Sequence, residues 1–384
     1  MTETKTQPSR AKSIETSTTI VLFLFALVAW STLSLVLDPG PIAKSENRYL
    51  ATMPSYGADG GGLVEYVRGL EGYLDDHLAF RDFMISLHAR FKVGWLGASP
   101  SEKLIVGKEG WFFVNDPTAV AQYRGIARLD AEQLETWRQV LEERRDWLAA
   151  RDVAFILVLA PNKHQIYSEY MPDHLPRVGV EEQHAQLAKY LKEHSTVQVV
   201  DLMPVMLEAK QKERVYHKTD THWNDVGAYL AYRQILAAVA VALPQFADNL
   251  QPVKVKLNRY VGRGIGLTSM VGLSDVYREE IPQLIKLDPR SKILMGKKTK
   301  HYAQLEREQK PLAHGVPGAA LPRAVIFRDS FSNSLIPYLS ENFSRVLYVW
   351  ARDVEGRIVE REQPDVVIQQ IAGRILDRAP VGIR

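Results

Sequence analysis

The segment Ala324-Val325-Ile326-Phe327-Arg328-Asp329-Ser330-Phe331-Ser332-Asn333-Ser334 decides how this sequence is interpreted. Its apolar residues have the length of a short buried strand, and a polar turn follows at Ser330, where a helix is expected to begin. In open parallel sheets, functional sites lie beyond the carboxyl ends of the strands. A serine at this turn would be exposed, beside backbone N–H groups that can stabilise an oxyanion. The alternative is that Asp329, Ser330 or Ser332 only caps the helix.

Helical and strand patterns alternate around this segment. Residues 130–151 have the amphipathic spacing of a helix with Asp130 as its N-cap, and residues 153–159 form a continuous apolar run of strand length. Further patterns predict a helix at 76–92, a hairpin at 106–113, helices at 181–194 and 224–243, strands at 197–202, 253–261, 324–327, 346–350 and 366–369, and a terminal helix. Strands separated by helices indicate an α/β fold, with a parallel sheet in a three-layer α/β/α domain. The charged stretch 278–311 receives no assignment.

A serine nucleophile needs a base, and the polar segment from Tyr216 to Asp225 offers one. Imidazole can take the hydroxyl proton if a carboxylate holds its tautomer and orientation. Asp220 and His222 are two residues apart, so a loop can place both side chains together, and Asn224 or Asp225 then caps the next helix. The alternative is a polar cap with a surface histidine, which is the preferred interpretation for His217.

Metal binding by His217, Asp220 and His222 is a rival interpretation of the same segment, because two imidazoles and a carboxylate are zinc ligands. Their spacing differs from the i, i+4 pair of a helical zinc site, and metal binding would leave the serine turn unexplained. We therefore expect neither a metal nor a cofactor.

A third polar segment follows the strand at 153–159 and opens at the same sheet edge. Asn162 or Lys163 is positioned there to donate to an oxyanion or a sugar hydroxyl. Tyr167 and Tyr170 can stack on a sugar ring, although aromatic residues near a strand end more often pack in the core.

Composition excludes several classes of protein. The 384 residues carry a net charge of +3, with basic and acidic residues interleaved, which does not suggest nucleic-acid binding. The absence of cysteine removes disulfides, cysteine-ligated metals and thiol nucleophiles.

The N-terminus predicts a membrane anchor. The run from Ile20 to Leu37 is long and apolar enough to span a bilayer and lacks a clear cleavage site. We expect a cytoplasmic tail at 1–17, a transmembrane anchor at 18–38, a Gly-, Pro- and Ser-rich tether at 39–75 and the main domain at 76–384. A buried core helix and a cleaved signal peptide are the alternatives for the apolar run.

In combination, these residues resemble the alginate O-acetyltransferase family of the AlgJ/AlgX type. The matching pieces, in order, are Glu46-Asn47-Arg48, Asp76-His77, Phe80-Arg81-Asp82, Gly107 to Phe113, Pro161-Asn162-Lys163 with Tyr167 and Pro172, Thr219 to Asn224, and Asp329-Ser330-Phe331-Ser332. The resemblance implies an SGNH hydrolase-like domain whose Asp220 and His222 precede Ser330, a circularly permuted order. The Arg-Asp-Ser-Phe-Ser sequence departs from the Gly-Thr-Ser-Tyr-Ser type of the alginate enzymes, so the polymer need not be alginate.

The resulting functional hypothesis is an exopolysaccharide O-acetyltransferase that forms an acetyl-serine at Ser330. Asp220 and His222 complete the triad, and backbone N–H groups around Ser330, including that of Phe331, form the oxyanion hole. The resemblance implies a polysaccharide acceptor and a membrane-bound O-acyltransferase partner that supplies acetyl, with the chain spanning the bacterial inner membrane once and its catalytic domain in the periplasm. An acetyl esterase with the same triad and a non-catalytic polysaccharide assembly subunit remain alternatives.

Overall fold

The computed structural model describes residues 21, 25, 42–43, 48–56, 62–77, 81–179, 183–295 and 311–383. They divide into two compact units, one formed by Met1–Leu96 with Ser269–Leu273 and the other by Gly97–Thr268 with Ser274–Arg384. The second unit contains all the candidate site residues.

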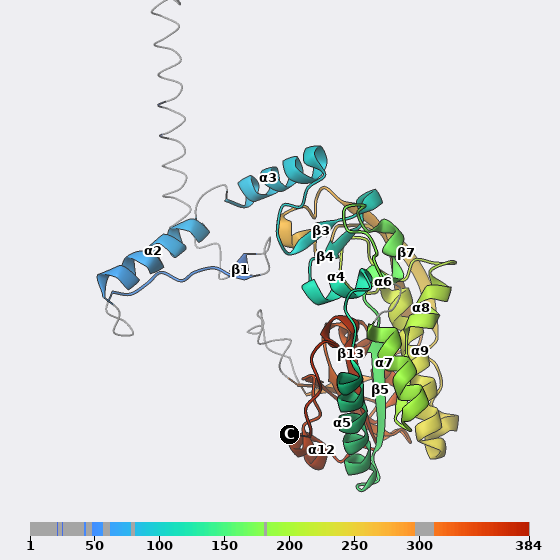
Figure 1. The fold of residues 1–384 in the computed structure, drawn as a ribbon. Coiled ribbons are helices and arrows are strands. Elements are labelled where there is room, and N and C mark those ends of the chain that lie inside the picture. Colours follow the sequence, from blue (N-terminus) through green and yellow to red (C-terminus); the bar gives the residue numbers. More distant parts are fainter. Residues whose placement is uncertain are drawn as a thin grey trace, which may run out of the picture. The chain divides into compact units, whose positions relative to one another are not determined.

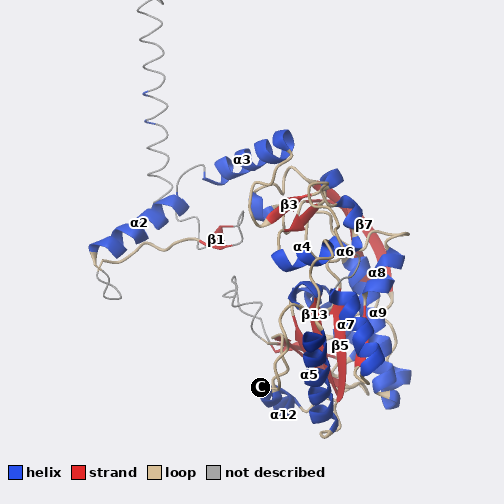
Figure 2. Ribbon diagram, viewed as in Figure 1, coloured by secondary structure: helices blue, strands red, loops and turns tan. Residues whose placement is uncertain are grey.

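A seven-stranded sheet forms the centre of the second unit (Figures 1 and 2). In spatial order its strands are β6 (Gln198–Asp201), β5 (Ala154–Ala160), β13 (Val366–Ala372), β11 (Arg323–Arg328), β12 (Arg345–Trp350), β10 (Leu312–Gly315) and β9 (Lys292–Met295). The first five are parallel, whereas β10 and β9 are antiparallel to their neighbours. The prediction of a purely parallel sheet is therefore wrong at this edge, because β9 lies in the unassigned charged stretch and β10 directly follows it.

Helices cover both faces of the sheet, which confirms the three layers. Alternate residues of β5 enter opposite cores, since successive side chains of a strand point to opposite faces. Phe155 and Leu157 join the core under α5 (Ala131–Ala149), α7 (Gln183–His194) and α12 (Gly356–Glu362). Ile156 and Val158 join the core under α8 (Met203–Ala209), α9 (Asp225–Ala242) and α11 (Ile336–Leu339).

The predicted N-caps are confirmed. Asp130 and Gln133 form a reciprocal capping box at the start of α5, with hydrogen bonds of 2.8 and 3.0 Å. Asn224 caps α9 by accepting a hydrogen bond from the Gly227 N–H at 3.1 Å. Each cap satisfies a backbone donor that the first turn of a helix leaves without a partner.

Two predicted helices are much shorter than expected. Ser330 begins a 3₁₀ turn, η6 (Ser330–Ser334), followed by the single turn of α11, whose Pro337 cannot donate a helical backbone hydrogen bond. After β13 the described chain contains only the 3₁₀ turn η8 (Gly373–Ile375) instead of a terminal helix.

The other elements of the second unit surround this core. The predicted hairpin consists of β3 (Leu104–Val106) and β4 (Phe112–Val114), and the exposed strand β7 (Val255–Arg263) pairs with an unexpected β8 (Arg278–Lys286). The remaining helical segments are η2 (Lys108–Gly110), α4 (Pro117–Tyr123), α6 (Lys163–Ile166), η3 (Ser168–Tyr170), η4 (Pro244–Asn249) and η7 (Ser340–Asn342).

The first unit contains β1 (Ile42–Ala43), β2 (Arg48–Tyr49), α2 (Leu63–His77), α3 (Arg81–Leu96) and η5 (Ser269–Val271). The helix expected at 76–92 is thus two helices, and the first lies where a tether was expected. The tail at 1–17 and the anchor at 18–38 lie outside the described residues except for positions 21 and 25. Within the described ranges, no helix has the length and apolar character that a membrane span requires.

Candidate active site

Ser330 lies directly beyond the carboxyl end of β11, which is a central strand of the sheet. The preceding Asp329 accepts hydrogen bonds from the Phe331 N–H at 2.9 Å and, through its other oxygen, from the Ala372 N–H at 2.8 Å. Asp329 therefore caps the turn and joins the end of β11 to the end of β13. The Ser330 hydroxyl contacts a histidine instead.

Ser330, His222 and Asp220 form a continuous chain of contacts. Ser330 Oγ is 2.7 Å from His222 Nε2, and His222 Nδ1 is 2.7 Å from Asp220 Oδ1. The same carboxylate oxygen accepts the His222 backbone N–H at 2.8 Å. The imidazole is partly exposed, with 26% of its side-chain surface accessible. This order of nucleophile, imidazole and carboxylate allows a hydroxyl to lose its proton as it attacks.

A tight loop between Tyr216 and Trp223 presents the Asp220 and His222 side chains. Tyr216 and Trp223 form an isolated antiparallel bridge, and the His217 N–H donates to His222 O at 3.2 Å. Trp223 Nε1–H donates to Phe331 O at 3.1 Å, so the loop is also bonded to the serine turn. The separation between base and nucleophile is therefore fixed by a second hydrogen bond beside the Ser330 contact.

Asp220 stays ionised in this setting. Burial acts to raise its pKa, but the hydrogen bonds and positive charge of His222 outweigh that effect, and the pKa falls to about 2. The carboxylate also faces Gly266, which has a φ of +52°, and a Cβ at that position would lie 1.7 Å from Asp220 Oδ2. Gly266 thus leaves the space that the carboxylate occupies.

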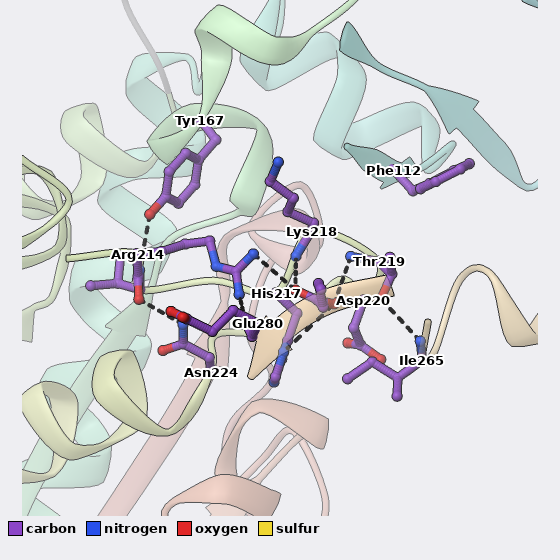
Figure 3. Close-up of polar contacts among 12 residues, drawn as sticks. Phe112, Tyr167, Arg214, His217, Lys218, Thr219, Asp220, Asn224, Ile265 and Glu280 are labelled. Atoms are coloured by element: carbon purple, nitrogen blue, oxygen red, sulfur yellow. Dashed lines mark hydrogen bonds and ion pairs between the residues drawn. The ribbon is translucent and has the colours of Figure 1, made fainter. Parts of the chain in front are cut away.

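Glu279, on β8, binds the first half of the loop and was not predicted from the sequence. Its buried carboxylate accepts the Lys218 N–H at 2.8 Å, and one oxygen accepts the Thr219 N–H at 3.2 Å and the Thr219 hydroxyl at 2.5 Å. Arg214 pairs with the same carboxylate at 3.1 Å. Figure 3 shows Arg214, Lys218 and Thr219 gathered beside Asp220. No local pattern identifies Glu279, because it lies in the charged stretch 278–311, which received no assignment.

Lys163 is a buried support of the same loop. Its Nζ donates to Phe112 O at 2.6 Å, Lys218 O at 2.8 Å and Asp220 O at 2.8 Å. All three ammonium protons are therefore used, and the side chain is 1% exposed. Desolvation lowers the pKa of Lys163 to about 7, although Asp220 and Glu279 act to raise it. The predicted role as a donor to substrate does not fit this geometry.

The other predicted auxiliary residues are also engaged within the protein. Asn162 donates from Nδ2 to Gln122 Oε1 at 2.7 Å, and its Oδ1 accepts the Arg374 N–H at 3.0 Å. Its amide is therefore not available to an oxyanion. Tyr167 is buried, and its hydroxyl accepts the Val215 N–H at 2.9 Å, which makes it a packing residue instead of a sugar platform. The ring of Phe331 packs edge-on against His222, with centroids 4.9 Å apart, while its N–H is bound by Asp329.

The rival metal site is not formed in the described part of the chain. No group of three or more His, Asp or Glu side chains there has a metal-binding arrangement. The His217 side chain is 15% exposed, with its Nδ1 4.0 Å from Glu279 Oε1. The expected surface histidine is therefore mostly enclosed, and this burial lowers the pKa of His217.

Part of this chain is similar to known proteins. Residues 104–279 match the family model of the SGNH hydrolase-like domain of the acetyltransferase AlgX, a range that includes Asp220 and His222 and ends before Ser330. The probable alginate O-acetylase AlgJ of Pseudomonas syringae pv. tomato is 26% identical over 192 residues, which are 49% of this chain and 46% of the relative. Its namesake from Pseudomonas putida is 29% identical over 140 residues, 36% and 34% of the two chains. This chain therefore spans less than half the length of these curated relatives.

Two solved structures are also similar. The O-acetyltransferase domain of Pseudomonas putida AlgJ shares 18% identity at a TM-score of 0.46, covering 71% of this chain and 91% of that one. Bacillus cereus PatB1 shares 15% identity at a TM-score of 0.47, covering 70% and 95%. The match to the family model and the similarity to the AlgJ relatives confirm the resemblance predicted from the sequence: residues 104–279 of this chain are similar to the SGNH hydrolase-like domain of the AlgJ/AlgX type of acetyltransferase.

Proposed function

We propose that this protein is a serine-dependent O-acetyltransferase that acetylates hydroxyl groups of an exopolysaccharide through an acetyl-serine at Ser330. The observation that carries the proposal is the contact chain from Ser330 through His222 to Asp220, with 2.7 Å at each step. The AlgX-type domain supports acetyl transfer as the reaction and a polysaccharide as the acceptor.

In the first half-reaction, Ser330 Oγ attacks the acetyl carbonyl carbon and its proton moves to His222 Nε2. Collapse of the tetrahedral intermediate breaks the bond to the donor's leaving group, which takes that proton from the imidazolium. In the second half-reaction, a sugar hydroxyl gives its proton to His222 and attacks the acetyl-serine. Ser330 then leaves as the alcohol with the proton returned, and Asp220 stabilises each imidazolium state.

We further propose the setting in which this reaction takes place. The apolar run at 18–38 anchors the chain in the bacterial inner membrane, with the catalytic domain in the periplasm. A separate membrane-bound O-acyltransferase supplies acetyl across the bilayer, since a single span has no path for it. These proposals rest on the N-terminal sequence and the family resemblance.

The test compares the full-length chain, purified in detergent, with its Ser330→Ala variant. Release of acetate from a chromogenic acetate ester is measured with and without an oligosaccharide acceptor. Transfer predicts acetylated oligosaccharide, and Ser330→Ala should lower the rate by roughly three orders of magnitude or more. Release to water alone would support the esterase alternative, while equal rates for both proteins would favour the non-catalytic assembly subunit.

A further inference from the structure

Arg374 is a cationic residue at the same sheet edge as Ser330, and the mechanism above does not use it. β11 and β13 are parallel neighbours, paired from Ala324 with Val366 to Phe327 with Gln369. Their carboxyl ends therefore lie together, and the Ala372 N–H donates to Asp329 Oδ2 across them at 2.8 Å. Arg374 follows Ala372 by two residues, and Ser330 follows Asp329 by one.

The side chain of Arg374 lies over the ring of Phe331, the residue that follows Ser330. Its Cζ lies 5.8 Å from the centre of the Phe331 ring, which itself contacts the ring of His222 at 4.9 Å. Among the described residues, the Arg374 guanidinium has no hydrogen-bond or ion-pair partner. In contrast, the guanidinium of Arg328, at the end of the neighbouring strand β11, donates from Nη1 to Asn333 Oδ1 at 2.7 Å.

The backbone that carries Arg374 is held by a buried polar network. The Arg374 N–H donates to Asn162 Oδ1 at 3.0 Å, and Gly373 O accepts from Gln122 Nε2 at 2.7 Å. Asn162 and Gln122 are joined by their own hydrogen bond of 2.7 Å and are 3% and 0% exposed. The turn is thus fixed in advance while its guanidinium remains available to a ligand, an arrangement that limits the reorganisation needed during a reaction.

An acyl transfer at Ser330 needs donors for the negative charge that develops on the carbonyl oxygen. The Phe331 N–H, expected from the sequence to serve there, already donates to Asp329 Oδ1 at 2.9 Å. We propose that Arg374 is a catalytic residue whose guanidinium donates hydrogen bonds to the acetyl carbonyl oxygen in both half-reactions. This inference rests on the proposed function of Ser330.

The chemical step balances without a proton from Arg374. As Ser330 Oγ bonds to the carbonyl carbon, the π electrons of the carbonyl move onto its oxygen, and the guanidinium stabilises the resulting oxyanion. When the intermediate collapses, those electrons restore the carbonyl and the leaving group departs with the proton from His222. A guanidinium suits this role because it stays charged at all working pH values and presents several donors in one plane.

The test uses the full-length chain and 4-nitrophenyl acetate, a neutral ester that carries only the acetyl group to be recognised. For Arg374→Gln we expect kcat to fall about 10²- to 10³-fold with KM changed by less than about threefold, because the interaction forms in the transition state. Arg374→Lys, which keeps the charge, should recover part of the loss. Arg378→Gln, an exposed arginine in the same terminal segment, is the matched control and should behave as wild type.

The kcat and KM of the Arg374 variants distinguish a catalytic role from acceptor binding. Wild-type kcat in Arg374→Gln on the neutral ester would overturn the role, and a rise confined to the KM for polysaccharide would assign Arg374 to acceptor binding instead. If Arg374→Gln does not fold, judged by its thermal unfolding, wild-type kcat in Arg374→Lys overturns the proposal and an intermediate rate upholds it. If wild-type turnover survives Ser330→Ala, the proposed function itself fails, and with it this role for Arg374.

Discussion

Gly266 and Asp220 are so close that a single methyl group cannot fit between them: a Cβ on residue 266 would lie 1.7 Å from Asp220 Oδ2 and 2.5 Å from its Cγ. We predict that Gly266→Ala displaces the carboxylate from His222 and lowers kcat by about 10²-fold or more, as loss of the orienting group does in triads. Steady-state turnover of an acetate ester measures the effect.

Gly318→Ala is the matched control for this substitution. Gly318 also has a positive φ, +79°, but a Cβ there would have no neighbour within 4 Å. Both substitutions carry the backbone strain of a left-handed alanine, roughly 1 kcal/mol, so only Gly266→Ala should lose activity. Equal kcat values in the two variants would contradict the steric argument.

The Asp220 carboxylate should link stability to acidic pH. Its pKa is lowered from 3.8 to about 2, so its contribution is complete above about pH 4 and is lost as pH falls through about 2. We expect the difference in unfolding free energy between wild type and Asp220→Asn to shrink by about 2 kcal/mol across that window. Denaturant titrations at pH 5 and pH 2 would measure it, and a difference that does not vary with pH would refute the assignment.

Asp220→Asn should also remove most of the activity at neutral pH. An asparagine cannot stabilise the imidazolium and favours the wrong tautomer of His222, which costs about 10⁴-fold in a serine triad. The measurement is kcat on a neutral acetate ester at pH 7. Asp275→Asn, which removes an exposed carboxylate paired with Arg263, is the control and should retain wild-type turnover.

Lys163→Met should loosen the Asp220 loop, because three buried carbonyl oxygens lose their donor. We expect a loss of several kcal/mol in unfolding free energy at pH 7, at about 1 to 3 kcal/mol per unsatisfied group. Lys108→Met, which removes an exposed lysine paired with Asp173, should lose less than about 1 kcal/mol. Equal destabilisation of both variants would show that the three contacts contribute little.

The pH dependence of Lys163→Met provides a second measurement. The pKa of Lys163 is about 7 in the folded protein and 10.5 ordinarily, so between these values the unfolded chain binds more protons. Wild type should therefore gain stability relative to Lys163→Met as pH rises from about 7 to 10. A constant difference across that range would mean that the ammonium is not strongly desolvated.

Glu279→Gln tests the buried carboxylate behind the loop. A glutamine presents N–H donors toward Lys218 and Thr219, which already donate, and removes the partner of Arg214. We predict a loss of about 3 kcal/mol in unfolding free energy, typical of breaking one side of a buried ion pair. The exposed neighbour Glu280 is the matched control, and a thermal or urea unfolding series on both Gln variants would distinguish them.

The site residues could be predicted from the sequence where they lie in a recognisable local pattern. β11 is a short apolar run that ends just before Ser330, and the loop carrying Asp220 and His222 precedes a capped helix, so both could be located and their combination in one triad predicted. The roles of these residues in catalysis stay predictions, although the structure places them in contact.

The supporting residues could not be found in the same way, because their partners are distant in the chain. A lysine such as Lys163 is ordinarily expected at the surface. Only the fold shows that its ammonium is buried and donates to the backbone carbonyl oxygens of Phe112 and Lys218. Glu279 lies on β8, an exposed ribbon strand whose charged residues conceal its alternation. Arg374 follows the last strand, where nothing in the local sequence separates it from other arginines near the terminus.

The last strand in the sequence, β13, occupies the middle of the parallel sheet, between β5 and β11. Every backbone ladder that joins the β5–β6 half to the β11–β12 half passes through Val366–Ala372. During synthesis, the two halves consequently have no common ladder until Val366–Ala372 has left the ribosome. A premature stop codon before Val366 would leave two half-sheets with no shared ladder, although Asp220, His222 and Ser330 would all have been translated.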